Sequence, residues 1–330
     1  MKTNQIIALV VAILVVGAGV FFVVNRGSIV DDRDRKIPDS EYYPVSIKTY
    51  HQGTDKYHEQ TFYESPKRIV VMQDTNLELL CYFGLEDRVV GTSAKVDAVT
   101  LFPEHQESYN AVEKRSGLST EVIISLEPDL IVAWTSYFNE NRGLLIPAWN
   151  DYGVNCIVTN RPAVTVDDYL DMLYSIGVVF NMVKEAEEKI ADFTSAYADV
   201  ERKTASMSEE DKPTVLVIEP GYETGGYGYG ASFLTGDLIT KAGGRNLFPG
   251  GMEMLSFEQI RAYDPDVVII VPDYTQFITT AEYSVNEFIT TPGFASMTDR
   301  VHGFEFYEIY MGGLLPDDII DRIFKVLYPD

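Results

Sequence analysis

A helix–turn–strand unit occurs twice in this chain, and no other feature of the sequence constrains the fold as strongly. Residues 119–132 (STEVIISLEPDLIV) match residues 256–269 (SFEQIRAYDPDVVI), which follow 137 positions later. Each copy starts with a serine that suits a helix N-cap, and Pro128 or Pro265 then ends the helix. The residues that follow are apolar on both faces, as a buried parallel strand requires. The repeat therefore predicts two related α/β lobes.

Alternating strand and helix patterns extend these lobes over residues 66–182 and 212–330. In the first lobe the predicted elements are strands at 68–72, 89–91, 130–133 and 156–158, and a helix over 75–83 that ends at Gly84. In the second lobe they are strands at 214–218 and 267–271, a glycine- and tyrosine-rich loop, and a helix that ends at Gly243 and Gly244. Apolar residues spaced three and four apart predict one long helix over 183–207. The expected fold is α/β, with two doubly wound lobes joined by a single long helix.

The N-terminus adds a predicted membrane segment. Residues 6–24 are 19 positions without a charge. As a helix they would extend about 28 Å, close to the thickness of the bilayer core. We expect a transmembrane anchor over 6–24, a cytoplasmic head at 1–5, and a tether with a β-hairpin around Gly53 over 25–65. A cleaved signal peptide is the alternative, because small residues stand at 17–19.

Two features of the sequence disagree on whether the body lies inside or outside the cytoplasm. Basic residues are more numerous after the apolar segment than before it, which by the positive-inside rule favours an internal body. A five-residue head before a single apolar segment is instead typical of an export signal. We expect a single-pass anchor in the cell membrane with the body outside the cytoplasm.

Composition excludes several classes of function. Fifty acidic residues against 26 basic ones give a net charge of −24, which is opposite to what a nucleic-acid-binding protein needs. Two cysteines and four scattered histidines do not provide a zinc or iron–sulfur framework, so we predict no metal site and no cofactor. Cys81 and Cys156 are interpreted as small buried apolar residues, with a disulfide as the alternative. His51 and His58 flank Gly53 and are expected at the surface.

Aromatic residues gather where the predicted strands end. Ligands of open α/β sheets bind beyond the carboxyl ends of the strands, and two facing lobes would form one cleft from both sets of loops. Flat aromatic side chains there suit a large, partly apolar ligand. The candidate ligand-binding residues are Trp134, Tyr137, Tyr222, Tyr227, Tyr229, Tyr274 and Tyr310.

Two apparent catalytic or nucleotide motifs have simpler explanations. Residues 226–231 fit the pattern G-x-G-x-x-A, but the preceding strand ends near Ile218 and no strand-end acid follows, so a dinucleotide site is not expected. Ser232 lacks the second glycine of a nucleophile elbow and is interpreted as a helix cap. With no nucleophile, base and orienting group in one place, the chain is not expected to be an enzyme.

Several segments together resemble the helical-bridge substrate-binding proteins of ABC importers, the receptors for ferric siderophores, haem and cobalamin. The resemblance covers roughly residues 66–327 and rests on the segments 66–72 (PKRIVVM), 76–80 (NLELL), 88–91 (RVVG), 117–134, 242–246 (AGGRN) and 256–266. It implies two α/β lobes joined by one long helix. The lipoprotein cysteine that is usual in this family is absent after the apolar segment, so anchoring depends on residues 6–24.

The resemblance also implies a function and a partner. It implies a monomeric extracytoplasmic receptor that binds a metal chelate, a ferric siderophore before cobalamin or haem, and delivers it to a permease with its ATPase subunits. Glu121 and Glu258 occupy equivalent positions of the repeat, where relatives use glutamates to engage the permease. The alternatives are a membrane-anchored extracellular enzyme on the same fold, and a receptor for a bare metal ion. The candidate cleft loops contain no histidine, which disfavours the bare ion.

Overall fold

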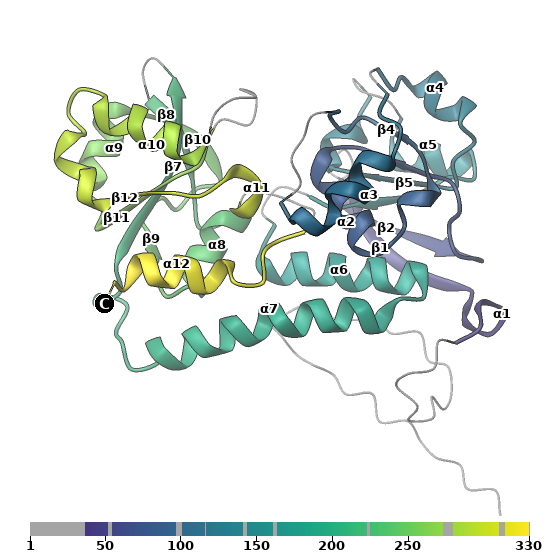
Figure 1. Ribbon diagram of the computed structural model, residues 1–330, viewed down its shortest axis with the longest axis horizontal. Coiled ribbons are helices and arrows are strands. Elements are labelled where there is room, and N and C mark those ends of the chain that lie inside the picture. The colour runs from purple at the N-terminus through teal and green to yellow at the C-terminus, as the bar shows by residue number, and fades with distance from the viewer. Residues whose placement is uncertain are drawn as a thin grey trace, which may run out of the picture.

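The computed structural model describes residues 37–329 except 52–54, 97–100, 116, 141–143, 161–163, 223–224, 273–279 and 310–313. The described chain forms two mixed α/β lobes that lie side by side above a long helix (Figure 1). None of the described helices is long and apolar enough to cross a membrane. The predicted anchor at 6–24 lies outside the described residues.

The first lobe, which we call the N lobe, is built on a parallel sheet. Its strand order is β4-β3-β5-β6. The strands are β3 (Ile69–Val71), β4 (Val89–Thr92), β5 (Leu130–Ala133) and β6 (Asn155–Val158). The helices are α2 (Asp74–Tyr82), α3 (Gln106–Ala111), α4 (Thr120–Ser125), α5 (Ile146–Asp151) and α6 (Val166–Phe180), with short 3-10 turns at Glu86–Arg88, Pro103–His105 and Thr135–Tyr137. Strands β3 and β5 are fully buried, and Gly84 ends α2 with a φ of +62°, as predicted.

A β-hairpin covers the outer edge of this sheet. Strands β1 (Val45–His51) and β2 (Lys56–Phe62) pair antiparallel, and α1 (Asp39–Tyr42) precedes them. The edge strand β6 has no neighbouring strand on this side, so side chains of the hairpin accept its N–H groups. Gln60 accepts from the Cys156 amide at 2.8 Å, and Thr49 accepts from the Val158 amide at 2.8 Å. The hairpin therefore belongs to the N lobe and not to the tether.

One hairpin histidine is not where the sequence placed it. His51 is fully buried, and its Nε2 lies 2.8 Å from the carbonyl oxygen of Phe138. The prediction of a surface histidine at this position is wrong, because the face of the hairpin that carries His51 packs against the N lobe. Cys81 and Cys156 are both buried free thiols, as the main interpretation expected.

The second lobe, the C lobe, has a mixed sheet of order β10-β8-β7-β11-β12, with β9 beside β7. The strands are β7 (Thr214–Tyr222), β8 (Gly225–Tyr229), β9 (Arg245–Asn246), β10 (Met252–Ser256), β11 (Val267–Ile270) and β12 (Val301–Gly303). The helices are α8 (Leu234–Lys241), α9 (Phe257–Tyr263), α10 (Ala281–Thr290), α11 (Phe306–Ile309) and α12 (Ile319–Leu327), with a 3-10 turn at Ala295–Arg300. Strands β7, β11 and β12 are parallel, whereas β8 and β10 are antiparallel to their neighbours.

The antiparallel strands correct the prediction of a doubly wound second lobe. The glycine- and tyrosine-rich segment expected as a loop is strand β8. Its glycines allow neighbouring backbones to approach, since a Cβ at Gly225 would lie 1.8 Å from the carbonyl oxygen of Leu255. Strand β8 pairs with β7 on one side and with β10 on the other. Residues 226–231 therefore do not form the strand-to-helix loop of a dinucleotide site.

The repeat performs the same structural task in each lobe. Ser119 caps α4 and Ser256 caps α9, each through its side-chain oxygen. The aspartate of each Pro-Asp pair then ties the turn to the start of the central strand. Asp129 accepts from the amides of residues 67 and 68 before β3, at 2.7 and 3.0 Å. Asp266 accepts from the amide and hydroxyl of Thr214 at the start of β7, at 2.8 and 2.6 Å.

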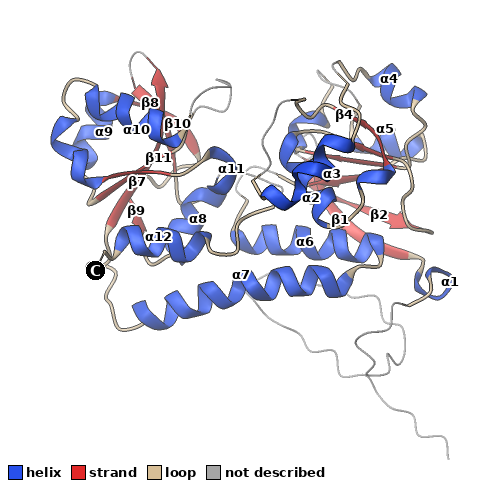
Figure 2. Ribbon diagram, viewed as in Figure 1, coloured by secondary structure: helices blue, strands red, loops and turns tan. Residues whose placement is uncertain are grey.

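Helix α7 (Val183–Thr204) connects the lobes and lies beneath both of them (Figure 2). Helix α6 lies between α7 and the N lobe, and the N-terminal end of α6 also contacts the C lobe. Asp237 of α8 accepts from the Val166 amide at 2.8 Å, and the Leu315 amide donates to the Tyr169 hydroxyl at 2.9 Å. The lobes are thus joined covalently by one helix but are held by two.

Candidate functional site

The carboxyl ends of both sheets face the space between the lobes. Helices α4 and α9 lie at the two far ends of the molecule (Figure 1). Four residues separate the end of α4 from the start of β5, and three separate α9 from β11. These strands therefore run inward, and their carboxyl ends point towards the opposite lobe. This is the region where ligands of α/β sheets bind.

The N-lobe sheet has a topological switch point at this edge. The chain leaves β3 for β4 on one side and returns to β5 on the other. The helices after such neighbouring strands diverge, which opens a crevice at their carboxyl ends. Gln73 lies two residues after the end of β3, and Trp134 directly follows β5. Thr159 follows β6 at the same edge.

Five buried polar atoms at this edge have no hydrogen-bond partner among the described residues. They are Gln73 Nε2, Thr75 Oγ1, Asn76 Oδ1, Trp134 Nε1 and Thr159 Oγ1. We call these five residues the N-lobe rim. Buried polar side-chain atoms in folded proteins are almost always bonded to protein or water, so such a group of unpaired donors and acceptors indicates a partner from outside the chain.

Hydrogen bonds fix how the rim presents these groups. The Oε1 atom of Gln73 accepts from Asn76 Nδ2 at 2.9 Å and from the Trp134 amide at 3.3 Å. Asn76 Nδ2 also donates to the Met72 carbonyl at 2.8 Å. Asn76 is completely buried, so its amide is a fixed support for Gln73. The rim is therefore a connected arrangement that spans β3 and β5.

Two of the predicted aromatic residues lie at this edge of the N lobe. Trp134 is half-buried, which leaves part of its ring accessible, while Nε1 is covered and unpaired. Tyr137 is half-buried in the 3-10 turn that follows. In the C lobe, Tyr227 is half-buried on β8, at the level of Glu219 on β7. Tyr222 ends β7, and nothing is described of its side chain.

The remaining three predicted tyrosines are not observed at the edge between the lobes. Tyr274 and Tyr310 lie outside the described residues. Tyr229 is fully buried, and its hydroxyl donates to the buried carboxylate of Glu219. The prediction that Tyr229 faces a ligand is not supported, because its ring is packed in the core, with its centre 5.6 Å from that of Phe233.

Glu121 and Glu258 lie in the first turns of α4 and α9, at the two far ends of the molecule (Figure 1). Both are exposed. A hydrogen bond from Ser119 lowers the pKa of Glu121, and bonds from its own backbone and from Ser256 lower the pKa of Glu258. The carboxylates are therefore charged at neutral pH and available to a partner on both lobes.

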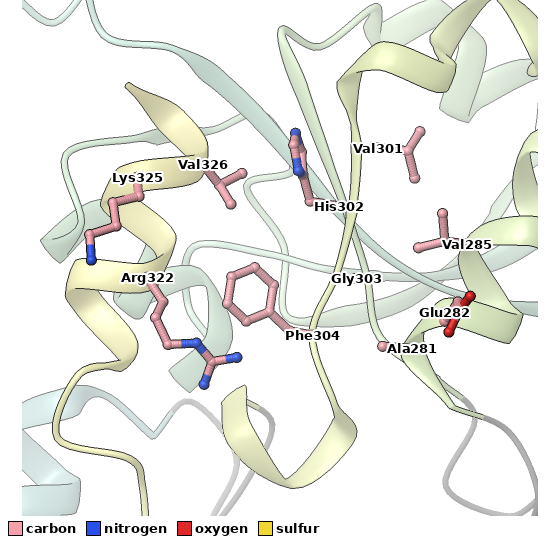
Figure 3. A pocket seen from close by; sticks show the side chains of 10 residues that line it. All are labelled: Ala281, Glu282, Val285, Val301, His302, Gly303, Phe304, Arg322, Lys325 and Val326. Atoms are coloured by element: carbon pink, nitrogen blue, oxygen red, sulfur yellow. The ribbon is translucent and has the colours of Figure 1, made fainter. Parts of the chain in front are cut away.

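A hollow in the C lobe lies away from the rim. It measures about 580 Å³ and lies in the C lobe between α10, β12 and α12 (Figure 3). Arg322 points into it but is held by two hydrogen bonds to Glu308, at 2.7 and 3.0 Å. No group of three or more His, Cys, Asp or Glu side chains in the described part of the chain could hold a metal ion.

Comparison with known proteins places the chain in a family. Residues 69–298 match the family described as periplasmic binding protein, which is more than half of the chain. The chain belongs to the periplasmic binding protein family. The resemblance stated from the sequence is thereby confirmed.

Individual relatives agree with this assignment. The chain is 24% identical to the ABC transporter substrate-binding lipoprotein YvrC of Bacillus subtilis, over 74% of each protein. It is 22% identical to a vitamin B12-binding protein of Photorhabdus laumondii, over 64% of this chain and 72% of the relative. A periplasmic binding protein of Veillonella parvula has the same fold, with a TM-score of 0.76, 24% identity, and coverage of 87% of this chain and 92% of that one.

The sequence reasoning missed most of the N-lobe rim. It placed residues 73–75 in a loop of the cleft but proposed only aromatic residues as ligand contacts, and it passed over Asn76 and Thr159, which are polar and of ordinary type. The position of Asn76 in the helix that follows β3, and of Thr159 directly after β6, was a usable signal. Their burial without partners was not, since it depends on how three separate strands meet.

Proposed function

We propose that this periplasmic binding protein is the extracytoplasmic receptor of an ABC importer and binds a metal chelate between its lobes. The N-lobe rim is the observation that carries the proposal. The partly exposed ring of Trp134 and the five buried polar atoms without a partner lie at one edge of the N lobe, and this combination suits an external partner with both apolar and polar groups. Chelates of the ferric siderophore, cobalamin and haem type have this character.

The kind of groups at the rim favours a chelate over a bare ion. Its unpaired atoms are two amide- or indole-type donors, two hydroxyls and one amide oxygen. None is a carboxylate, thiol or imidazole, the groups that hold most transition-metal ions in proteins. A chelate already supplies ligands to its metal and offers its outer oxygen atoms and apolar surface to the protein. A ferric siderophore is the first candidate, followed by cobalamin and haem.

Delivery to a permease is the second part of the proposal. Glu121 and Glu258 provide one exposed, charged carboxylate on each lobe, and arginines in the two halves of a permease would pair with them. The relative YvrC is a lipoprotein, whereas in this chain no cysteine directly follows the apolar segment and the first one is Cys81. We propose that residues 6–24 anchor the protein in the membrane with its body outside the cytoplasm.

Binding of known chelates tests the first part. The purified protein is incubated with a ferric siderophore, cobalamin or haem and examined by native mass spectrometry. One of them should bind at one equivalent, and Trp134→Ala should weaken that binding about tenfold, since ring stacking and buried area are both lost. Tyr152→Ala is the control, because Tyr152 is 62% exposed and lies on α5's end, away from the rim. No binding by any chelate, or equal binding by Trp134→Ala, would contradict the proposal.

A further inference from the structure

The exposed carboxylates of Glu121 and Glu258 have different surroundings, although they occupy the same position of the repeat. Three residues after Glu258, α9 carries Arg261, whereas α4 carries Ile124 three residues after Glu121. The Nη2 atom of Arg261 lies 3.4 Å from Oε1 of Glu258. No cationic side chain of the described chain forms an ion pair with Glu121. One carboxylate is therefore paired within its own helix, and the other is not.

Arg261 is held in place by contacts besides the ion pair. Its guanidinium lies 5.6 Å from the ring centre of Phe294, close enough for a cation–π attraction. Its Nη1 atom donates to the carbonyl oxygen of Pro292 at 3.4 Å. The Arg261 side chain is 38% exposed, against 79% for Glu258. The positive charge therefore stays at this surface whether or not Glu258 is engaged by a partner.

The residue after each glutamate differs in the same direction. Val122 follows Glu121 and is an exposed apolar side chain. Gln259 follows Glu258, and its Oε1 accepts from the Ser256 amide at 2.8 Å to complete the capping box of α9. The N-lobe end thus presents an unpaired carboxylate beside an apolar group. The C-lobe end presents polar groups that are already bonded within their own helix.

We propose that a permease binds the N-lobe end more strongly than the C-lobe end, because Arg261 weakens the contact that Glu258 makes. This inference rests on the docking part of the proposed function and adds the chemistry of the partner surface at each end. At α4 the matching surface is an arginine beside an apolar side chain, which pair with Glu121 and Val122. At α9 an arginine of the partner meets a carboxylate that is already paired, and a second guanidinium that repels it.

The size of the difference follows from the exposure of the Glu258–Arg261 pair. An exposed ion pair within one helical turn changes an equilibrium by about two- to fivefold. Removing the charge of Arg261 should therefore strengthen docking by a factor in this range. Charge pairs that are desolvated in an interface contribute more than exposed ones, so loss of the Glu121 carboxylate should weaken docking at least about tenfold.

Single substitutions in the full chain separate the two ends. The variants are Glu121→Ala, Glu258→Ala, Arg261→Gln, and Arg261→Gln combined with Glu258→Ala. Their affinity for the cognate permease with its ATPase subunits, reconstituted in lipid nanodiscs, is measured by surface plasmon resonance at low and physiological salt. No chelate is added, so that only docking is measured. Thermal unfolding followed by circular dichroism shows that each variant is folded.

A reciprocal substitution places the same arginine in the N lobe. Ile124→Arg puts a guanidinium one helical turn after Glu121, as Arg261 stands after Glu258. Ile124 is half-buried against the N-lobe core, so Ile124→Gln is the matched control for the loss of its apolar side chain. Ile124→Arg should dock more weakly than Ile124→Gln, because its added charge competes for Glu121 and repels an arginine of the partner.

The other variants should follow the same order. Glu121→Ala should weaken docking at least about tenfold, and Glu258→Ala about threefold or less. Arg261→Gln should dock about two- to fivefold more tightly than the wild type. In the Arg261→Gln background, Glu258→Ala should cost more than it does in the wild type, since the carboxylate is then unpaired.

Three results would contradict these expectations. A loss from Glu258→Ala that equals or exceeds the loss from Glu121→Ala would overturn the inference and leave docking through both carboxylates standing. Weaker docking by Arg261→Gln would also overturn it, since Arg261 would then itself be a contact of the partner. If neither alanine substitution weakens docking, alone or combined, the docking part of the proposed function is refuted and the inference falls with it.

Discussion

Lys189 holds a buried positive charge where the two lobes meet, and replacing it tests how they are joined. It lies on α7 with its side chain only 4% exposed. Its Nζ is 2.6 Å from Asp317 Oδ1 of the C lobe, whose side chain is 43% exposed. The same Nζ lies 4.9 Å from the ring centre of Phe102 and 5.6 Å from that of Tyr82, both in the N lobe. One ammonium group thus contacts both lobes.

The two ends of this ion pair should respond differently to substitution. Asp317→Asn leaves a buried ammonium without its counter-charge. Breaking a fully buried pair in this way costs about 3–5 kcal/mol, and the partial exposure of Asp317 reduces the expected cost to about 2 kcal/mol. Lys189→Met keeps the apolar stem against Phe102 and Tyr82 and leaves Asp317 hydrated. The loss of cation–π attraction is offset by relief of desolvation, so about 0–1 kcal/mol is expected.

Urea and thermal unfolding at pH 7, followed by far-ultraviolet circular dichroism, measure both costs. Asp317→Asn should unfold about 2–4 °C below Lys189→Met. The double variant should resemble Lys189→Met, because asparagine then faces no buried charge. Asp199→Asn, at an exposed ion pair on the same helix, is the control and should change little. If Lys189→Met costs as much as Asp317→Asn, the buried charge is not what makes this junction sensitive.

Three further predictions concern docking, pH and motion. Glu121→Ala combined with Glu258→Ala should leave chelate affinity unchanged but strongly reduce ligand-stimulated ATP hydrolysis by the cognate importer. The interaction of the wild-type protein with the importer should weaken as the salt concentration rises. Full activity of the double variant would contradict docking through these carboxylates. Hydrogen bonds from Thr214 lower the pKa of Asp266, so its stabilisation is complete above the ordinary aspartate pKa and is lost as pH falls through the lowered value. The stability advantage of the wild type over Asp266→Asn should therefore be full above about pH 5 and shrink towards pH 3, and a constant difference would disprove the assignment. Because α7 is continuous and α6 is tied to the C lobe, ligand should change the radius of gyration in solution scattering only slightly, which a large decrease would refute.

Local sequence chemistry was sufficient for the elements that depend on neighbours along the chain. The serine caps, the helix stop at Gly84 and the strand at 130–133 all follow from residues within a few positions, and the structure has them where the sequence placed them. The repeat also predicted two lobes, because each copy specifies one buried strand. The long helix over 183–207 could be predicted because its apolar residues recur at helical spacing. The observed helix α7 ends three residues earlier, at Thr204.

What the sequence could not specify are features made by segments that are distant along the chain. Strand β8 looked like a loop, since glycine is a poor strand former until two neighbouring strands approach it closely. Tyr229 looked like a ligand-facing residue until pairing of β8 with β7 turned its ring into the core. The aromatic residues expected at the site were chosen because they lie near predicted strand ends, whereas the N-lobe rim joins residues 73, 75, 76, 134 and 159. Only the tertiary structure brings these strand ends together and leaves their polar atoms buried without partners, because hydrogen-bond satisfaction is a property of the assembled edge and not of any one strand.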